Sequence, residues 1–194
     1  MMKKTSTLPF FKRNDSAILE LKTLSVETFR ALPFMGVDGT MSAKQHFAQR
    51  KAAIMACTDL TAEEFETFTA PDFNQLYSDI AAFILKPSDE LRDQPLTGKD
   101  FEFTLLFPFE NELGETIEHI RFKVPKVAHS EALAEITDQH EREDFMFRVV
   151  CGLEKTDFNR MAINDYLAIK PQVGAFFQQS GDFFRPTTLK ASLI

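Results

Sequence analysis

The chain is similar to itself, and this similarity constrains its fold more than any other feature. When the sequence is aligned with itself at an offset of 93 residues, apolar positions meet apolar positions and an aspartate meets an aspartate, without a gap. Such a repeat predicts two copies of one small unit, although helical periodicity alone can also align the apolar positions of unrelated amphipathic helices. The pairs are Leu60 with Leu153, Phe65 with Phe158, Phe68 with Met161, Asp72 with Asp165, Phe73 with Tyr166, Leu76 with Ile169, Ile80 with Val173 and Phe83 with Phe176.

A second register, at an offset of about 100 residues, extends the similarity towards the start of each copy. It places Leu8–Phe10 against Phe107–Phe109, and Lys22 against Lys123. The two registers differ by a few residues, so the first copy is expected to carry an insertion around Pro33–Ser42, where Gly36 and Gly39 mark a loop.

The second copy is expected to begin with a β-hairpin. Bulky side chains alternate along the first strand, which predicts that they share one face of the sheet. Pro108 predicts an edge position or a bulge, and Glu110–Glu115 is the expected turn. The alternating residues are Phe101, Phe103, Leu105, Phe107 and Phe109 in the first strand, then Ile120, Phe122 and Val124 in the second.

Helices are expected to follow this hairpin. The pattern predicts a helix over 127–137 that buries Ala132, Leu133 and Ile136, and a helix over 141–150 that ends before Gly152. A short helical turn with Phe158 and Met161 comes next, and then a last helix with Asn164 as its N-cap and a kink or break near Ile169, because of Pro171. The helix over 141–150 should bury Phe145, Met146, Val149 and Val150.

The first copy repeats this plan. Strands over 8–12 and 17–24 should form its hairpin, and its helices are expected over 26–32, 42–57, 62–68 and 71–85. The predicted fold is therefore α+β and helix-rich, with two tandem copies of a β-hairpin followed by several short α-helices. We assign residues 1–86 to the first copy, 87–99 to a linker, 100–181 to the second copy and 182–194 to a C-terminal tail.

The bulk properties exclude several classes of protein. The formal net charge is −7, which argues against a nucleic-acid binder, since such proteins carry a basic patch. No segment has the length or apolarity of a membrane span, and no signal peptide is visible at the start. Cys57 and Cys151 lie in no metal-ligand spacing and are expected to be buried and reduced. These features predict a soluble, cytoplasmic protein.

The chain contains no recognisable catalytic, phosphate-binding or metal-binding motif. The richest polar cluster is Asp138–Asp144, in which His140 and Asp144 share one helix face. A metal would need further ligands, so a solvated helix start with acids that favour the helix dipole is the preferred interpretation. We therefore predict no enzyme activity and no cofactor. An enzyme of unrecognised type remains an alternative.

Two apolar segments lie where a solvated surface is expected, in the loop after residue 32 and in the C-terminal tail. Each could pack on its own domain or bind a partner. The candidate partner-binding residues are Phe34, Met35, Val37, Phe183, Phe184, Leu189, Leu193 and Ile194.

The order of motifs in the second copy resembles the tail assembly chaperones of Mu-like and P2-like bacteriophages. The motifs are a strand that leads into Val124-Pro125, a helix that ends in Ala132–Glu135, an apolar helix that ends in Gly152-Leu153, and a short helix before a final helix up to Phe177. The resemblance covers Phe101–Gln179, and it reaches Leu8–Leu85 only through the repeat.

This resemblance implies a protein of the host cytoplasm that binds the tape-measure protein, with tail-tube subunits as a further partner, and that leaves before the tail matures. Self-association stays open. Family members are usually a single unit, whereas two are predicted here. The alternative is a structural or adaptor component that remains in a phage or phage-like particle.

Overall fold

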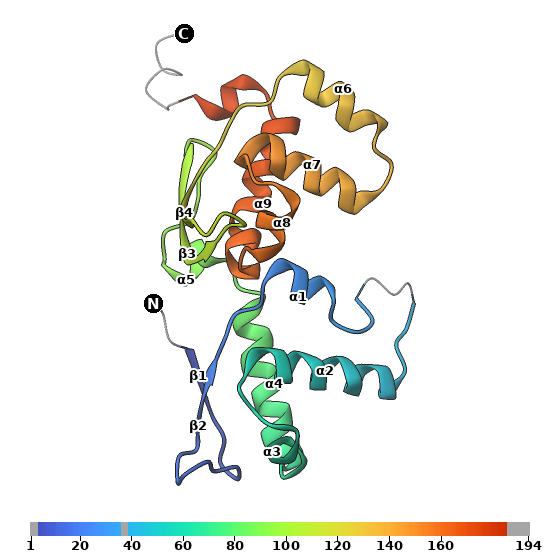
Figure 1. Ribbon diagram of the computed structural model, residues 1–194, viewed down its shortest axis with the longest axis vertical. Coiled ribbons are helices and arrows are strands. Elements are labelled where there is room, and N and C mark those ends of the chain that lie inside the picture. Colours follow the sequence, from blue (N-terminus) through green and yellow to red (C-terminus); the bar gives the residue numbers. More distant parts are fainter. Residues whose placement is uncertain (1–3, 36–38, 186–194) are drawn as a thin grey trace. The chain divides into compact units, whose positions relative to one another are not determined.

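A computed structural model describes residues 4–35 and 39–185 of the chain. It divides the chain into two compact units: Met1–Lys86 with Ala162–Asn164, and Pro87–Met161 with Asp165–Ile194. Each unit contains a two-stranded antiparallel hairpin that is followed by helices (Figure 1). The predicted α+β, helix-rich fold class is confirmed.

The first unit begins with a hairpin, as predicted, but its first strand lies earlier than expected. Lys4 pairs with Leu21 and Thr7 with Ile18, while the expected strand over 8–12 is not formed. Pro9 has no N–H group to donate, so the ladder cannot continue through it. The elements are β1 (Lys4–Thr7), β2 (Ile18–Leu21), α1 (Val26–Arg30), α2 (Ala43–Cys57), α3 (Ala62–Glu66) and α4 (Ala70–Ile84).

All four helices of the first unit lie where the sequence predicts them, and each begins at a side-chain cap. The hydroxyl oxygens of the N-cap residues accept backbone N–H groups from the first helical turn. The core lies along α4, where Leu76 and Ile80 are fully buried and Phe83 nearly so. The N-caps are Ser25, Ser42, Thr61 and Thr69.

Asn164 does not cap the last helix as predicted. It lies inside the first turn of α9 (Ile163–Gln178). Its side-chain amide instead donates to the carbonyl groups of Phe83 and Lys86, at 2.7 and 2.8 Å. These bonds add side-chain donors to carbonyl groups at the end of α4, where the regular helical donors run out.

The second unit contains a helix in the segment that was expected to be a linker. Pro87 lies before α5 (Ser88–Leu91), whose first residues, Ser88 and Asp89, are buried. Acidic residues in a first helical turn favour the helix dipole, which explains a helix here. The other elements are β3 (Glu102–Glu110), β4 (Thr116–Arg121), α6 (Val127–Glu135), α7 (Gln139–Cys151), α8 (Lys155–Arg160), most of α9, and a 3-10 turn, η1 (Gly181–Phe184).

The hairpin of the second unit has the predicted bulge. Phe103 pairs with Ile120, but the register shifts between Thr104 and Phe109, next to Pro108. On the predicted inner face, Phe103, Leu105, Phe107, Ile120 and Phe122 are buried. Phe101 is 41% exposed, but its ring faces α9 as predicted, with its centroid 5.6 Å from that of Phe176. The expectation for Val124 is wrong, because Val124 lies beyond the end of β4 and is 66% exposed.

The buried faces of α6 and α7 differ from the prediction. In α6 only Leu133 is buried, and Ala132 is exposed. In α7 the buried residues are Phe147, Val150 and Cys151, spaced as i, i+3 and i+4, whereas Phe145 and Met146 are half-buried. Apolar residues lie on several sides of α7 between Phe145 and Cys151, so the pattern does not decide which side is buried. The contact of Phe147 with Phe158 of α8 decides it.

The last helix, α9, continues through Pro171, so the expected break is absent. A proline inside a helix removes one backbone bond, here the bond to the carbonyl of Leu167. No described helix is long and apolar enough to cross a membrane.

Candidate functional site

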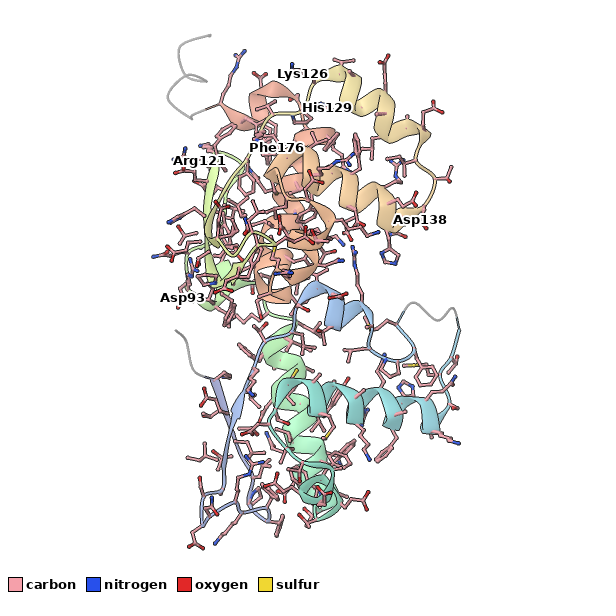
Figure 2. The ribbon with its side chains drawn as sticks, viewed as in Figure 1. Asp93, Arg121, Lys126, His129, Asp138 and Phe176 are labelled. Atoms are coloured by element: carbon pink, nitrogen blue, oxygen red, sulfur yellow. The ribbon has the colours of Figure 1, made fainter. Side chains whose placement is uncertain are left out.

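The acidic cluster at the start of α7 acts as a helix cap. Asp138 lies just before α7 (Figure 2). Its carboxylate accepts the backbone N–H of Glu141 at 2.8 Å. Asp144 forms an ion pair with Lys155 at 3.4 Å, and His140 is exposed. Within residues 4–35 and 39–185, no three His, Cys, Asp or Glu side chains are grouped so that they could hold a metal ion.

The apolar loop of the first unit is described up to Met35. Phe34 is half-buried and has a φ of 61°, in the left-handed region that bulky residues rarely adopt. Met35 is 40% exposed, and the Gln49 amide donates to the carbonyl of Pro33 at 3.1 Å. Val37, the third residue predicted here, lies outside the described residues.

In the C-terminal segment, η1 packs on the second unit. The ring of Phe184 stacks on Phe176, with ring centroids 4.7 Å apart, and its centroid lies 6.4 Å from that of Phe101. The structure therefore brings Phe183 and Phe184 together on their own domain, which was one of the two interpretations of the tail. The predicted residues Leu189, Leu193 and Ile194 lie outside the described residues.

Phe183 is seated on Gly98. A Cβ atom at position 98 would lie 2.2 Å from Cε1 of the Phe183 ring, closer than atoms can approach. Only glycine allows the ring to lie this close to the backbone. Phe183 is still 41% exposed, so one side of it faces away from the domain.

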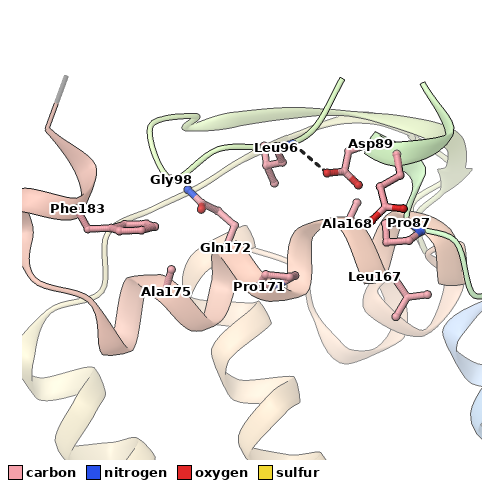
Figure 3. A pocket seen from close by; sticks show the side chains of 11 residues that line it. Pro87, Asp89, Leu96, Gly98, Leu167, Ala168, Pro171, Gln172, Ala175 and Phe183 are labelled. Carbon is pink, nitrogen blue, oxygen red and sulfur yellow. Dashed lines mark hydrogen bonds between the residues drawn. The ribbon is translucent and has the colours of Figure 1, made fainter. Parts of the chain in front are cut away.

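Phe183 and Gly98 form one end of a pocket of about 240 Å³ (Figure 3). Helix α9 forms its floor, and the segment from α5 to Gly98 forms its opposite wall. Most of the lining is apolar, and the main apolar residues are Leu96, Leu167, Ala168, Pro171 and Ala175.

Asp89 supplies a buried carboxylate to this pocket. One of its oxygens, Oδ2, accepts the backbone N–H of Leu96 at 2.9 Å, as the dashed line in Figure 3 shows. The other, Oδ1, is buried and has no hydrogen-bond partner among the described residues. Asp89 was not among the predicted site residues, because 87–99 was expected to be a linker. The run Pro87-Ser88-Asp89-Glu90 is typical of a helix start and could have revealed the order of this segment.

A second buried carboxylate, Asp165, joins α9 to the hairpin. It accepts hydrogen bonds from the hydroxyl of Ser88 at 2.5 Å and from the backbone N–H groups of Leu106 and Phe107, both at 2.9 Å. Burial raises the pKa of the Asp165 carboxyl, although these three hydrogen bonds oppose the shift. Both of its oxygens accept hydrogen bonds from the protein, so its role is structural.

A family model for phage tail assembly chaperone proteins (E, or 41 or 14) matches residues 102–178. These residues are thus similar to the phage tail assembly chaperones, and the match covers less than half of the chain. The match runs from β3 to the end of α9, which is most of the second unit. Neither a curated protein nor a solved structure gives a significant match to the chain.

The pocket of Figure 3 extends beyond the residues that match the family model. Its floor, Leu167–Ala175, lies inside the matched residues. Asp89, Leu96 and Gly98 precede the match, and Phe183 follows it. Segments that precede and follow the matched residues therefore supply walls of the pocket.

Proposed function

We propose that the chain is a non-catalytic tail assembly chaperone that acts in the cytoplasm of the bacterial host and binds the tape-measure protein, with tail-tube subunits as a further partner. The match of residues 102–178 to the chaperone family carries this proposal. Long helical proteins expose apolar stripes that aggregate when bare, and a small domain with apolar surface can cover them. The residues proposed for this contact are Phe34, Met35, Val37, Phe183, Phe184, Leu189, Leu193 and Ile194.

We propose further that the first unit is a second, diverged copy of the chaperone domain. The order of elements supports this, because β1–β2 and α1–α4 correspond to β3–β4 and α6–α9. Two ring pairs also correspond. Phe65 and Phe73 have ring centroids 5.9 Å apart, and their counterparts, Phe158 and Tyr166, are 5.7 Å apart.

Two backbone contacts repeat as well. The N–H of Lys22 donates to the carbonyl of Cys57 at 2.7 Å, and the N–H of Lys123 donates to that of Val150, also at 2.7 Å. Cys57 and Val150 are separated by the same 93 residues as the aligned side chains. Unrelated amphipathic helices would share a pattern of apolar residues, but they would not share the point at which a strand end meets a helix end. Two domains in one chain would strengthen binding through effective concentration.

Co-expression with the tape-measure protein of the same phage tests the function. The full chain should keep the tape-measure protein in the soluble fraction and co-purify with it, while the tape-measure protein alone should precipitate. No binding and no gain in solubility would refute the chaperone proposal. Recovery of the chain at stoichiometric levels in purified mature particles would favour the structural or adaptor alternative.

A chain that ends at Arg185 tests the proposed tail contact separately, because it keeps η1 and its stacking on Phe176. Reduced solubilisation by this variant would support a role for Leu189, Leu193 and Ile194. Unchanged activity would remove only the tail from the proposal.

A further inference from the structure

We propose that the pocket of Figure 3 receives the side chain of a lysine from a partner protein, with the ammonium group on Oδ1 of Asp89. This inference rests on the proposed function in one respect, because the partner is taken to be the protein that the chaperone binds. The pocket itself is formed by residues of the second unit.

One oxygen of Asp89 is an unpaired acceptor within the described residues. Asp89 is 9% exposed, and its Oδ1 has no donor among the described residues. Buried polar atoms are almost always hydrogen-bonded, and an unpaired charged one is costly. Figure 3 shows the carboxylate at the pocket end near Pro87 and Ala168. A ligand in this pocket can supply the missing donor.

The charge of the pocket lining favours a cation. The eleven residues around the pocket include two acids, Asp89 and Glu90, and no lysine, arginine or histidine. The carbonyl of Leu167, below the pocket, lacks its helical donor because Pro171 has no N–H. The side-chain amide of Gln172 already donates to the carbonyl of Asp100 at 3.1 Å. The pocket therefore offers acceptors and favours a cation that donates.

The walls of the pocket are apolar. The volume of about 240 Å³ is bounded by the side chains of Leu96, Leu167, Pro171 and Phe183. A lysine side chain has a long apolar stem and a charged end, and it buries the stem readily when the end finds a partner. The arrangement of apolar walls and one buried acceptor matches this chemistry.

Lysine fits better than arginine or a metal ion. Arginine binds a carboxylate best through both oxygens at once, but Oδ2 of Asp89 is already occupied by the N–H of Leu96. A compact ammonium needs only single acceptors. A divalent cation needs six or more oxygen ligands, and the described residues hold no group of three acidic or imidazole side chains at this place.

The test is a titration of the full chain, followed by the amide NMR signals of Leu96 and Ala168. The probe is N-acetyl-lysine N-methylamide, and the matched neutral probe is N-acetyl-norleucine N-methylamide, which keeps the stem and lacks the ammonium. The lysine probe should shift both signals saturably and bind at least about tenfold more tightly than the norleucine probe, since a charge-assisted bond to a buried carboxylate is lost with the latter. The arginine probe should fall between them.

Asp89→Asn supplies the decisive variant. Its amide oxygen can still accept from Leu96, while its NH2 group occupies the place of Oδ1 and offers a donor instead of an acceptor. The preference for lysine over norleucine should vanish. Asp93→Asn is the matched control: Asp93 is exposed, does not line the pocket, and has a φ of 53° that asparagine tolerates. It should keep the full preference.

Equal binding of the two probes, or an unchanged preference in Asp89→Asn with native thermal stability, would overturn the lysine pocket. The titration contains no tape-measure protein, so this failure would leave the chaperone proposal intact. A clear preference for lysine in a chain that does not bind the tape-measure protein would instead refute the proposed function and keep the pocket.

Discussion

Asp72 and Asp165 hold corresponding places in the two units. Each carboxylate is fully buried in the first turn of a long helix, and each accepts a backbone N–H from the hairpin side of its unit. The donor is Phe10 for Asp72, at 3.3 Å, whereas Leu106 and Phe107 both donate to Asp165 at 2.9 Å. In each unit an aspartate therefore joins the long helix to the hairpin side, and the hydrogen bonds are shorter in the second unit.

Replacing Asp165 with asparagine should destabilise the second unit strongly. Asparagine keeps one acceptor oxygen and turns an NH2 group towards backbone donors, so the loss should be about 3 kcal/mol. The free energy of unfolding can be measured in urea, with NMR signals followed for each unit. Asp72→Asn should cost less because its bond to Phe10 is longer. The exposed Asp182→Asn is the control, and equal effects at 165 and 182 would contradict the structural role.

The stability of the second unit should also depend on pH through Asp165. Burial raises the pKa of this carboxyl, so the folded state binds its proton more tightly than the unfolded state does. The contribution is complete below the unfolded pKa, about 4, and is lost as the pH rises through the raised folded pKa. The difference in unfolding free energy between the wild type and Asp165→Asn should thus shrink from low pH to neutral pH. A difference that grows with pH would mean that the pKa is lowered.

The hairpin face gives a direct packing test. Phe103 is 7% exposed, and truncation to alanine should cost about 3–5 kcal/mol, as for other large buried aromatic residues. Phe101 is 41% exposed and lies 5.6 Å from the Phe176 ring, so Phe101→Ala should cost clearly less. Urea unfolding of both variants measures the difference. A negligible cost for Phe103→Ala would show that this face does not form the core.

Most of the helices and both hairpins could be predicted from the sequence because their signals are local. Ser42 and Thr61 cap helices through contacts three residues away, and Pro108 marks the bulge by lacking an N–H group. The face of α7 could not be predicted this way, since the run Phe145–Cys151 is apolar on several sides and the contact with α8 decides which side is buried.

Most of the candidate site could not be predicted from the sequence. The position of Phe183 depends on its contact with Gly98, which is far away in the sequence. The environment of Asp89 depends on the folding of Leu96 back onto it and on the packing of α9. The composition of 87–99, with two prolines among charges, is typical of a linker, and only tertiary contacts show that its start is buried. The apolar character of Phe183 and Phe184 was visible in the sequence, but their packing on Phe176 was not decided by it.

Both cysteines should be inert in the folded protein. Cys57 and Cys151 are buried free thiols, and burial raises the pKa of Cys57 to about 12 and raises that of Cys151 further. At pH 8 almost no thiolate is then present in either, so a disulfide reagent such as DTNB should label neither within the time that labels both in urea. Rapid labelling of one cysteine in the native protein would show that its helix end opens.

The contact between Gly98 and Phe183 predicts a strong coupling between two residues that flank the matched residues 102–178. Gly98→Ala places a methyl group 2.2 Å from the Phe183 ring, so the ring must leave its site and the end wall of the pocket is lost. In a chain that already carries Phe183→Ala, the same methyl group meets empty space and should be tolerated.

A double-mutant cycle on unfolding free energy should therefore give a coupling of roughly 1–3 kcal/mol between positions 98 and 183. Gly181→Ala, at a glycine whose added Cβ would meet nothing within 4 Å, is the matched control and should show no coupling with position 183 through steric contact. Additive effects of Gly98→Ala and Phe183→Ala would mean that the ring does not rest on Gly98 in solution. In that case η1 would be free to leave the domain, and Phe183 would be available as the partner-binding residue that the sequence predicts.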